Sequence, residues 1–320
     1  MGYMDAGTWH IGETPKRIQA GHYVRPETQF RDTVTSDGAR GPKAEVGRYH
    51  LYAAHACPWA HRTMLLRALK GLEEVISLSF VLPRMLDNGW ELEPGTGPVA
   101  SARYMHDVYR AANSEYSGRC SVPVLWDCTR NTIASNESAE IVRMLNFAFD
   151  AFATRSVPDL YPETLRAEID ELNELVYHNI NNGVYKCGFA TGQAAYEESF
   201  HNLFAALDTL ESRLATRRYL CGEHLTEADW RLFATLIRFD AVYVGHFKCN
   251  RQRIADYPNL SNYTRELYQF PGVAETFDLA KTKEHYYCSH ESVNPNGIVP
   301  VGPYLDFDAP HDRARLTAAS

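Results

Sequence analysis

Residues 48 to 62 place a cysteine between an apolar stretch and a proline, in the order RYHLYAAHACPWAHR. The pattern predicts a strand at 49–53 and a helix that starts at Pro58, because proline is well tolerated at the first helical position. Cys57 then becomes the N-cap and faces free backbone N–H groups and the positive end of the helix dipole. Such a position can lower the pKa of a cysteine from ~8.5 to roughly 3.5–7.5. The segment therefore predicts a strand that delivers a reactive thiol to a helix N-terminus.

The pattern around this cysteine continues as β-α-β. Apolar residues recur at helical spacing from 58 to 70, Gly71 provides a C-terminal cap, and the run VISLSFVL predicts a strand over 75–82. Further patterns predict a helix near 101–112, strands at 122–127 and 132–134, and a helix over 139–147. This order of elements predicts an α/β domain of the thioredoxin-like type.

The rest of the chain divides into an arm, a helical region and a tail. Residues 1–47 show no sustained period and predict an extended arm, which Trp9 and Phe30 could anchor. The thioredoxin-like domain is expected over 48–150, followed by a linker at 151–162, where prolines interrupt the pattern. Helical periodicity predicts an all-α domain over 163–290, with an irregular tail over 291–320.

Composition excludes several classes of partner. A formal net charge of −8 with dispersed basic residues argues against nucleic acid. No apolar stretch is long enough to span a membrane, and the N-terminal residues lack a secretory pattern, so we expect a cytoplasmic protein. The seven cysteines are widely spaced and contain no C-x-x-C pair, which indicates neither a disulfide framework nor a zinc knuckle.

Cys57 lacks a resolving thiol one helical turn along, because position 60 is alanine. The second thiol of an exchange reaction must then come from outside the chain, and glutathione is the abundant cytosolic candidate. His55 and His61 flank the cysteine and could ligate zinc with it. They bracket a helix start, and we prefer the thiol chemistry to a metal site.

A site for this tripeptide needs a strand edge, an anion-binding helix end and an acidic residue. The backbone of Val122, directly before Pro123, could pair with an extended peptide, particularly if the bond between them is cis. Glu137 and Ser138 fall at a predicted helix N-terminus, where they suit an amine and a carboxylate. Plain helix capping explains the same two residues equally well.

Motifs throughout the chain carry a family resemblance. In the first half they are CPWAHR at 57–62, NGW at 88–90, YSGR at 116–119, VPVLWD at 122–127 and SNESAEI at 135–141. In the second half they are NNGVYK at 181–186, GFA at 188–190, LTEAD at 225–229, RFD at 238–240, HFKC at 246–249 and NPNGI at 294–298. Together they resemble the Xi-class glutathione transferases, the glutathionyl-hydroquinone reductases.

This resemblance implies the two-domain glutathione transferase fold and an activity. The activity is reduction of S-glutathionyl-hydroquinones by glutathione, with Cys57 as the nucleophile, a cysteine–glutathione mixed disulfide as the intermediate and no metal. The resemblance further implies that glutathione is held by Trp90, Arg119, Val122, Glu137 and Ser138. It also implies that Tyr185 and Tyr286 line the acceptor pocket and that the protein is a homodimer.

Two other functions share parts of this sequence pattern. An Omega-like thioltransferase or dehydroascorbate reductase would use the same cysteine chemistry. A non-catalytic glutathione-transferase-like binding module would keep the fold, but loss of the nucleophile or of the Glu137–Ser138 pair would be expected, and both are present.

Overall fold

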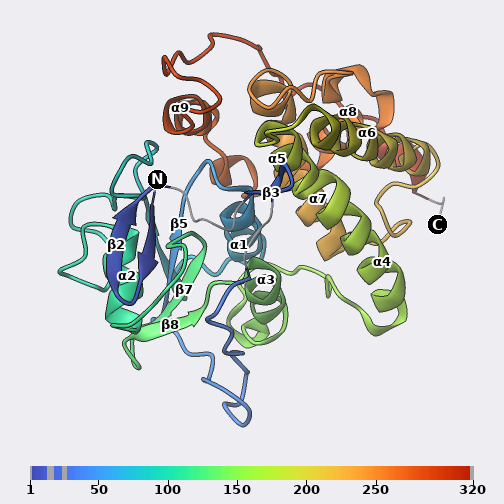
Figure 1. Ribbon diagram of the computed structural model, residues 1–320. Helices are drawn as coiled ribbons and strands as arrows, with labels where there is room; N and C mark the ends of the chain where they lie inside the picture. Colours follow the sequence, from blue (N-terminus) through green and yellow to red (C-terminus); the bar gives the residue numbers. More distant parts are fainter. Residues whose placement is uncertain (1, 13–17, 24–26, 318–320) are drawn as a thin grey trace. The chain divides into compact units, whose positions relative to one another are not determined.

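The computed structural model describes residues 2–12, 18–23 and 27–317, which form two compact units (Figure 1). The first unit comprises the described residues within Met1–Arg17, Pro26–Val157 and Thr276–Ser289. The second comprises those within Ile18–Arg25, Pro158–Glu275 and His290–Ser320. Among the described residues, no helix combines the length and the apolar character that crossing a membrane would require.

These units depart from the predicted linear domains at two places. Residues 276–289 group with the first unit, although the sequence pattern placed them in the helical domain. The reason lies in long-range contacts: His285 Nδ1 lies 2.9 Å from the Pro83 carbonyl oxygen, and Met85 N–H donates to Ser289 Oγ at 2.9 Å. Residues 18–23, predicted as part of the arm, group with the second unit.

A four-stranded mixed sheet forms the centre of the first unit, in the order β6-β5-β7-β8. Its strands are β5 (Tyr49–Ala53), β6 (Ile76–Phe80), β7 (Val124–Asp127) and β8 (Thr132–Ser135). β5 runs parallel to β6 and antiparallel to β7, and every residue of β5 is buried. The predicted strands are confirmed with differences in their bounds. β6 is shorter than the predicted 75–82, and β7 starts at Val124 because Pro123 has no N–H for the ladder.

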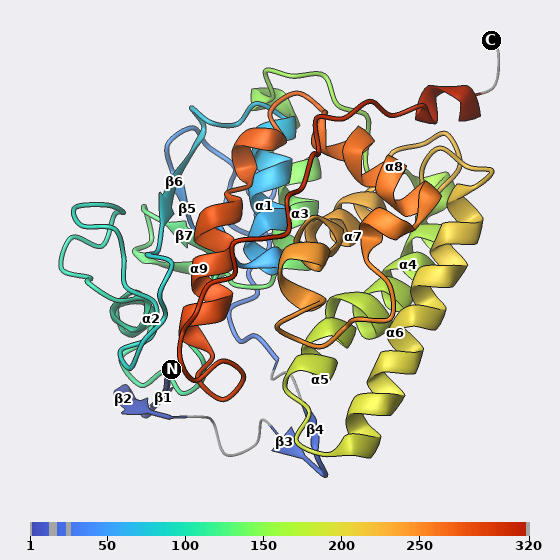
Figure 2. The same cartoon turned by 90° about the horizontal axis from the view of Figure 1, so that it is seen from above.

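Helices cover both faces of this sheet. α1 (Pro58–Leu69) and α3 (Ser138–Phe147) lie side by side on one face, and α2 (Met105–Ala112) lies on the other (Figures 1 and 2). α9 (Leu279–Ser289) completes the unit. The predicted thioredoxin-like arrangement is therefore confirmed, and it directs the N-terminus of α1 to the end of the central strand.

The predicted arm contains more regular structure than its sequence indicated. β1 (Gly2–Asp5) and β2 (Thr8–Ile11) form an antiparallel hairpin. Further along, Asp32 N–H donates to the Ala134 carbonyl at 2.9 Å, so that the arm extends the sheet beside β8. Phe30 packs on Tyr116 with ring centroids 5.6 Å apart, as an anchor should.

The second unit is a bundle of helices. They are α4 (Arg166–Val176), α5 (Gly183–Gly188), α6 (Gln193–Leu214), α7 (Glu227–Arg238) and α8 (Pro258–Tyr268). A short hairpin of β3 (Ile18–Gln19) and β4 (His22–Tyr23) also belongs to this unit. The predicted cap of α7 is confirmed, because Thr226 and Asp229 form a capping box.

Two segments of this unit are π-helical. η3 (Tyr177–Asn181) links α4 to α5, and η4 (Phe239–Tyr243) extends α7. Single π-helical turns are often found at functional sites. Apolar periodicity predicted neither of them, because 5 residues are too few for spacing to separate a π-helical turn from the α-helix beside it.

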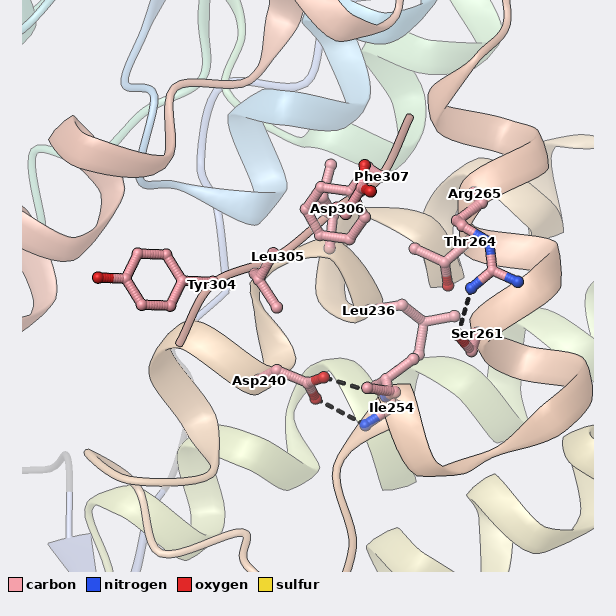
Figure 3. A pocket seen from close by; sticks show the side chains of 12 residues that line it. Leu236, Asp240, Ile254, Ser261, Thr264, Arg265, Tyr304, Leu305, Asp306 and Phe307 are labelled. Atoms are coloured by element: carbon pink, nitrogen blue, oxygen red, sulfur yellow. Dashed lines mark hydrogen bonds between the residues drawn. The ribbon is translucent and has the colours of Figure 1, made fainter. Parts of the chain in front are cut away.

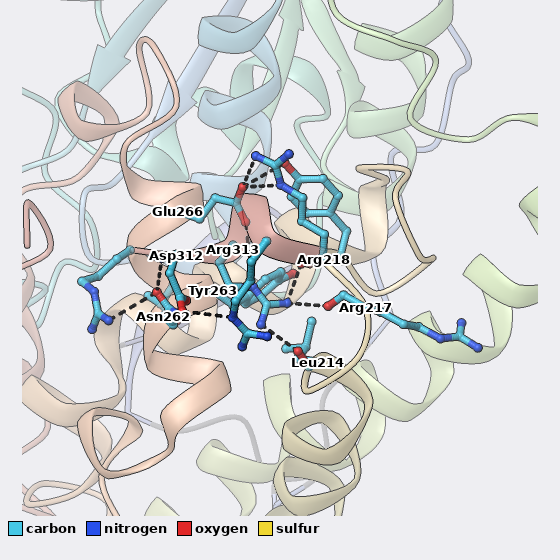
Figure 4. Close-up of polar contacts among 12 residues, drawn as sticks. Leu214, Arg217, Arg218, Asn262, Tyr263, Glu266, Asp312 and Arg313 are labelled. Atoms are coloured by element: carbon cyan, nitrogen blue, oxygen red, sulfur yellow. Dashed lines mark hydrogen bonds and ion pairs between the residues drawn. The ribbon is translucent and has the colours of Figure 1, made fainter. Parts of the chain in front are cut away.

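The predicted irregular tail follows the bundle closely. It closes over a cavity of about 110 Å³ that Leu236, Ile254 and Phe307 help to line, while Tyr304 points away from it (Figure 3). Arg313 inserts its guanidinium into the unit beside the end of α6 (Figure 4). This side chain is fully buried. The tail is therefore part of the folded unit.

Candidate active site

Cys57 occupies the position that the sequence predicted. It is the N-cap of α1, and its Sγ accepts a hydrogen bond from Ala60 N–H at 3.4 Å. The thiol also lies 3.4 Å from the carbonyl oxygen of Val122, to which it donates. The N–H contact favours the thiolate, whereas the carbonyl contact favours the protonated thiol. The residue is half-buried, so the sulfur is neither sealed in the core nor fully solvated.

Val122 joins this cysteine to the sheet. It precedes β7, is 3% exposed, and is linked to Pro123 by a cis peptide bond. Because its carbonyl oxygen reaches the sulfur, a peptide that paired with this stretch of backbone would pass close to Cys57. This is the arrangement expected of a thiol-containing peptide site.

Glu137 and Ser138 stand at the start of α3, as predicted. Glu137 is the N-cap, and its Oε1 accepts from Ala139 N–H at 3.1 Å. Its other oxygen, Oε2, accepts from Thr28 Oγ1 at 3.1 Å, a contact from the arm that the sequence did not indicate. Ser138 is the first helical residue and is buried. Capping is therefore present, because the Glu137 carboxylate accepts from the Ala139 N–H at this helix N-terminus. The binding of a ligand carboxylate there stays a prediction.

Trp90 stacks against a histidine from a distant part of the chain. Its ring lies 4.5 Å from that of His285 at an interplanar angle of 20°, and the tryptophan is 7% exposed. His285 is held in turn by the Pro83 carbonyl. Sequence reasoning missed His285, because nothing local shows a contact between residues almost two hundred positions apart.

Arg119 lies in the loop before β7. The residue is half-buried, and its carbonyl oxygen accepts from Tyr116 OH at 3.0 Å. Gly118, directly before it, adopts a positive φ of 149°. The hydrogen bond from the Tyr116 hydroxyl therefore joins residues 116 and 119 of this loop.

The two predicted acceptor-pocket tyrosines belong to different units. Tyr286 lies in α9 of the first unit and is 1% exposed. Tyr185 lies in α5 of the second unit, within an aromatic cluster that includes Tyr243 and Phe247. The first unit therefore contains Cys57, all five predicted glutathione residues and Tyr286. The roles of both tyrosines and of the five glutathione residues stay predictions.

The two histidines that flank Cys57 have other contacts. His55 stacks on Phe80 with ring centroids 3.9 Å apart. His61 is fully buried, and its Nε2 lies 2.8 Å from Thr276 Oγ1. Within the part of the chain that the structure describes, no group of three or more His, Cys, Asp or Glu side chains could hold a metal ion.

Cys57 differs from the other six cysteines in its place at a helix N-terminus. Only Cys57, Cys128 and Cys288 are half-buried, and the other four are buried. Burial raises the pKa of Cys221 to about 11 and raises the pKa of Cys128 as well. A raised pKa leaves little thiolate at neutral pH.

Comparisons with known proteins agree with this geometry. The model of the glutathione S-transferase N-terminal domain matches residues 56–147, and that of the C-terminal domain matches residues 193–266. The chain is 49% identical to the glutathionyl-hydroquinone reductase YqjG of Escherichia coli over 98% of both chains. It is 52% identical to the glutathionyl-hydroquinone reductase PcpF of Sphingobium chlorophenolicum, over 95% of this chain and 96% of that one.

A solved structure and a third relative extend the comparison. The Xi-class glutathione transferase from Natrialba magadii superposes with a TM-score of 0.93 at 44% identity, over 99% of this chain and 98% of that chain. A relative from Schizosaccharomyces pombe, 45% identical over 88% of this chain and 94% of its own length, is named glutathione S-transferase omega-like 2.

A thioredoxin-like unit that presents a thiol at a helix N-terminus, together with a helical bundle, defines the class of thiol-dependent transferases and reductases. Within that class, the chain belongs to the glutathione transferase family, in its Xi class.

Proposed function

We propose that this protein reduces S-glutathionyl-hydroquinones to hydroquinones at the expense of glutathione. The observation that carries the proposal is the half-buried Cys57 sulfur at the N-terminus of α1, within reach of the Val122 carbonyl. Two relatives that match nearly the whole chain, at 49% and 52% sequence identity, are named for this activity. Ordinary conjugating transferases activate glutathione with a hydroxyl group, whereas a cysteine at this place captures glutathione covalently.

The reaction proceeds in two thiol-exchange steps. The Cys57 thiolate attacks the sulfur of the aromatic thioether, forming a mixed disulfide with the glutathionyl group. The carbon–sulfur bond breaks, and the ring carbon takes up a proton to give the hydroquinone. A second glutathione then attacks the mixed disulfide, which releases glutathione disulfide and restores Cys57. The sum is one thioether and one glutathione converted to one hydroquinone and one glutathione disulfide.

In this proposal, five residues of the first unit hold glutathione. Val122 offers backbone, Glu137 suits the free amine, and Ser138 with the N-terminus of α3 suits a carboxylate. Arg119 pairs with a carboxylate of the tripeptide, and Trp90 supplies an aromatic wall. No metal takes part.

Expulsion of carbon from sulfur requires the ring to accept electrons. A phenol that hydrogen bonds to a ring oxygen stabilises the charge that develops there. On the family resemblance, we assign this role to Tyr286 and Tyr185.

The decisive experiment replaces the nucleophile. Cys57→Ser should abolish turnover of a glutathionyl-hydroquinone, measured by chromatography of the released hydroquinone. Cys128→Ser, a half-buried cysteine of the same unit, is the matched control and should keep full activity. Retention of most activity in Cys57→Ser would refute the proposal.

The S. pombe relative named omega-like favours a second candidate, a thioltransferase or dehydroascorbate reductase. Both activities use the same thiol, so only substrate preference separates them. We expect faster turnover of the glutathionyl-hydroquinone than of dehydroascorbate when both are measured on one preparation. If the protein is instead a non-catalytic binding module, mass spectrometry will find no glutathione mixed disulfide on Cys57.

We further propose a cytoplasmic homodimer. A cytosolic supply of reduced glutathione would support the second step, and the family resemblance favours the dimer. Light scattering coupled to size-exclusion chromatography measures the mass in solution, and a single species at the monomer mass would refute the dimer.

A further inference from the structure

The N-terminal hairpin presents one of its faces to the glutathione-site loops. In its register Met4 pairs with Trp9, and Tyr3 pairs with His10. Cross-strand partners share a face and neighbouring pairs alternate, so Met4 and Trp9 lie on one face and Tyr3 and His10 on the other. Met4 is 1% exposed, which identifies the Met4–Trp9 face as the packed one. The hairpin lies beside α2 in both views (Figures 1 and 2).

The edge of β1 holds the loop that carries Arg119. Met4 N–H donates to the Gly118 carbonyl at 2.8 Å, and Gly118 N–H donates back to the Met4 carbonyl at 2.9 Å. Gly7 N–H donates to the Tyr116 carbonyl at 3.1 Å. Residues 116–118 thus pair with the hairpin like a third strand, and Arg119 is the next residue along the chain.

Trp9 holds the loop that carries Trp90. Its indole N–H donates to the Asp87 carbonyl at 3.0 Å, and its ring stacks on His106 with centroids 4.6 Å apart. Gly89 adopts a φ of +74°, and a Cβ built there would lie 2.9 Å from the Trp9 ring. A side chain at position 89 would therefore be strained and would push Trp9 away. Trp90 follows directly.

We propose that Trp9 is a positioning residue for glutathione. The hairpin ties together two loops that are remote in sequence, and each presents a residue assigned to the tripeptide. Loops that are ordered before binding spare the ligand the entropic cost of ordering them, which raises affinity. The role of Trp9 presupposes the proposed function, because Trp90 and Arg119 are assigned to glutathione there.

Calorimetric titration with glutathione tests this role without requiring turnover. Trp9→Ala should raise the Kd about tenfold, which corresponds to ~1.4 kcal/mol. Trp9→Phe keeps an aromatic ring against Gly89 and His106 but loses the indole donor, so its Kd should rise by a smaller factor. His10→Ala removes the ring contact with Tyr3 on the opposite face and should leave the Kd unchanged.

Kinetics provide a second readout. With a glutathionyl-hydroquinone, Trp9→Ala should raise the KM of both substrates and change kcat less than twofold, because the reacting sulfur is untouched. A loss of folded protein would instead lower the number of binding sites and leave the Kd of the remainder unchanged. If Trp9→Ala does not fold, Gly89→Ala displaces the same ring and should give the same rise in Kd.

Three results would overturn the role of Trp9. They are an unchanged Kd in folded Trp9→Ala, an equal rise in His10→Ala, and a wild-type protein that binds no glutathione. The last result would also remove the proposed function. A wild type that binds glutathione but does not turn over glutathionyl-hydroquinones would remove the proposed function alone, and the Kd comparison would still decide the role of Trp9.

Discussion

Replacement of Arg313 by alanine should destabilise the second unit strongly. Its side chain is fully buried in the tail (Figure 4). It donates to the carbonyl oxygens of Leu214 at 2.7 Å, Arg217 at 2.5 Å and Arg218 at 2.7 Å. Its Nε also lies 4.0 Å from a carboxylate oxygen of Glu266, which is 2% exposed. One guanidinium therefore satisfies acceptors at and beyond the end of α6 and balances a buried charge.

The expected loss follows from what the substitution leaves behind. A buried acceptor without a donor costs about 1–3 kcal/mol, and removing one member of a buried ion pair costs about 3–5 kcal/mol. Water that enters the vacated space will replace some of the lost hydrogen bonds, and Glu266 keeps its contact with Arg218. Both effects reduce the loss of stability. We therefore expect Arg313→Ala to lower the free energy of unfolding by about 3–5 kcal/mol.

Urea denaturation followed by far-ultraviolet circular dichroism measures this loss, because most helices lie in the second unit. Arg315→Ala is the matched control. Its side chain is half exposed and pairs with Asp312, so its loss should stay below about 1 kcal/mol. A loss below 1 kcal/mol in Arg313→Ala, or equal losses in the two variants, would refute the reasoning that the tail is anchored by this buried guanidinium.

Two further predictions concern acid stability and the proposed acceptor site. Burial, together with the positive charge of the nearby Arg67, lowers the pKa of His50 to about 4. In the unfolded state the pKa of histidine is about 6.5, so acid protonates the unfolded state before the folded one. The contribution of His50 to the free energy of unfolding should therefore be fully present above pH 6.5 and should decrease by about 3 kcal/mol between pH 6.5 and 4. His50→Gln should flatten this decline in urea midpoints, and parallel curves would contradict the assignment. Tyr286→Phe should lower kcat for a glutathionyl-hydroquinone about 10²-fold with an unchanged glutathione Kd, whereas Tyr287→Phe serves as the control; an unchanged kcat in Tyr286→Phe would exclude the hydrogen-bonding role.

Local sequence determined the elements that create the reactive centre. The buried strand β5 and the proline at the start of α1 fix where Cys57 lies, because they act through backbone chemistry within a few residues. The helix N-terminus at Glu137 and Ser138 was predictable for the same reason. The family motifs added the substrate class, which no local rule could provide.

Tertiary structure alone decided which distant residues support that centre. His285 stacks on Trp90, Thr28 reaches Glu137, and Trp9 holds the loop beside Gly89. Each contact joins segments far apart in the sequence, and its formation depends on the packing of the whole unit. Periodicity and capping report the conformation of neighbouring residues, so the sequence determined the position of Cys57 and of its helix. Only the folded chain determined which distant residues hold the surroundings of Cys57 in place.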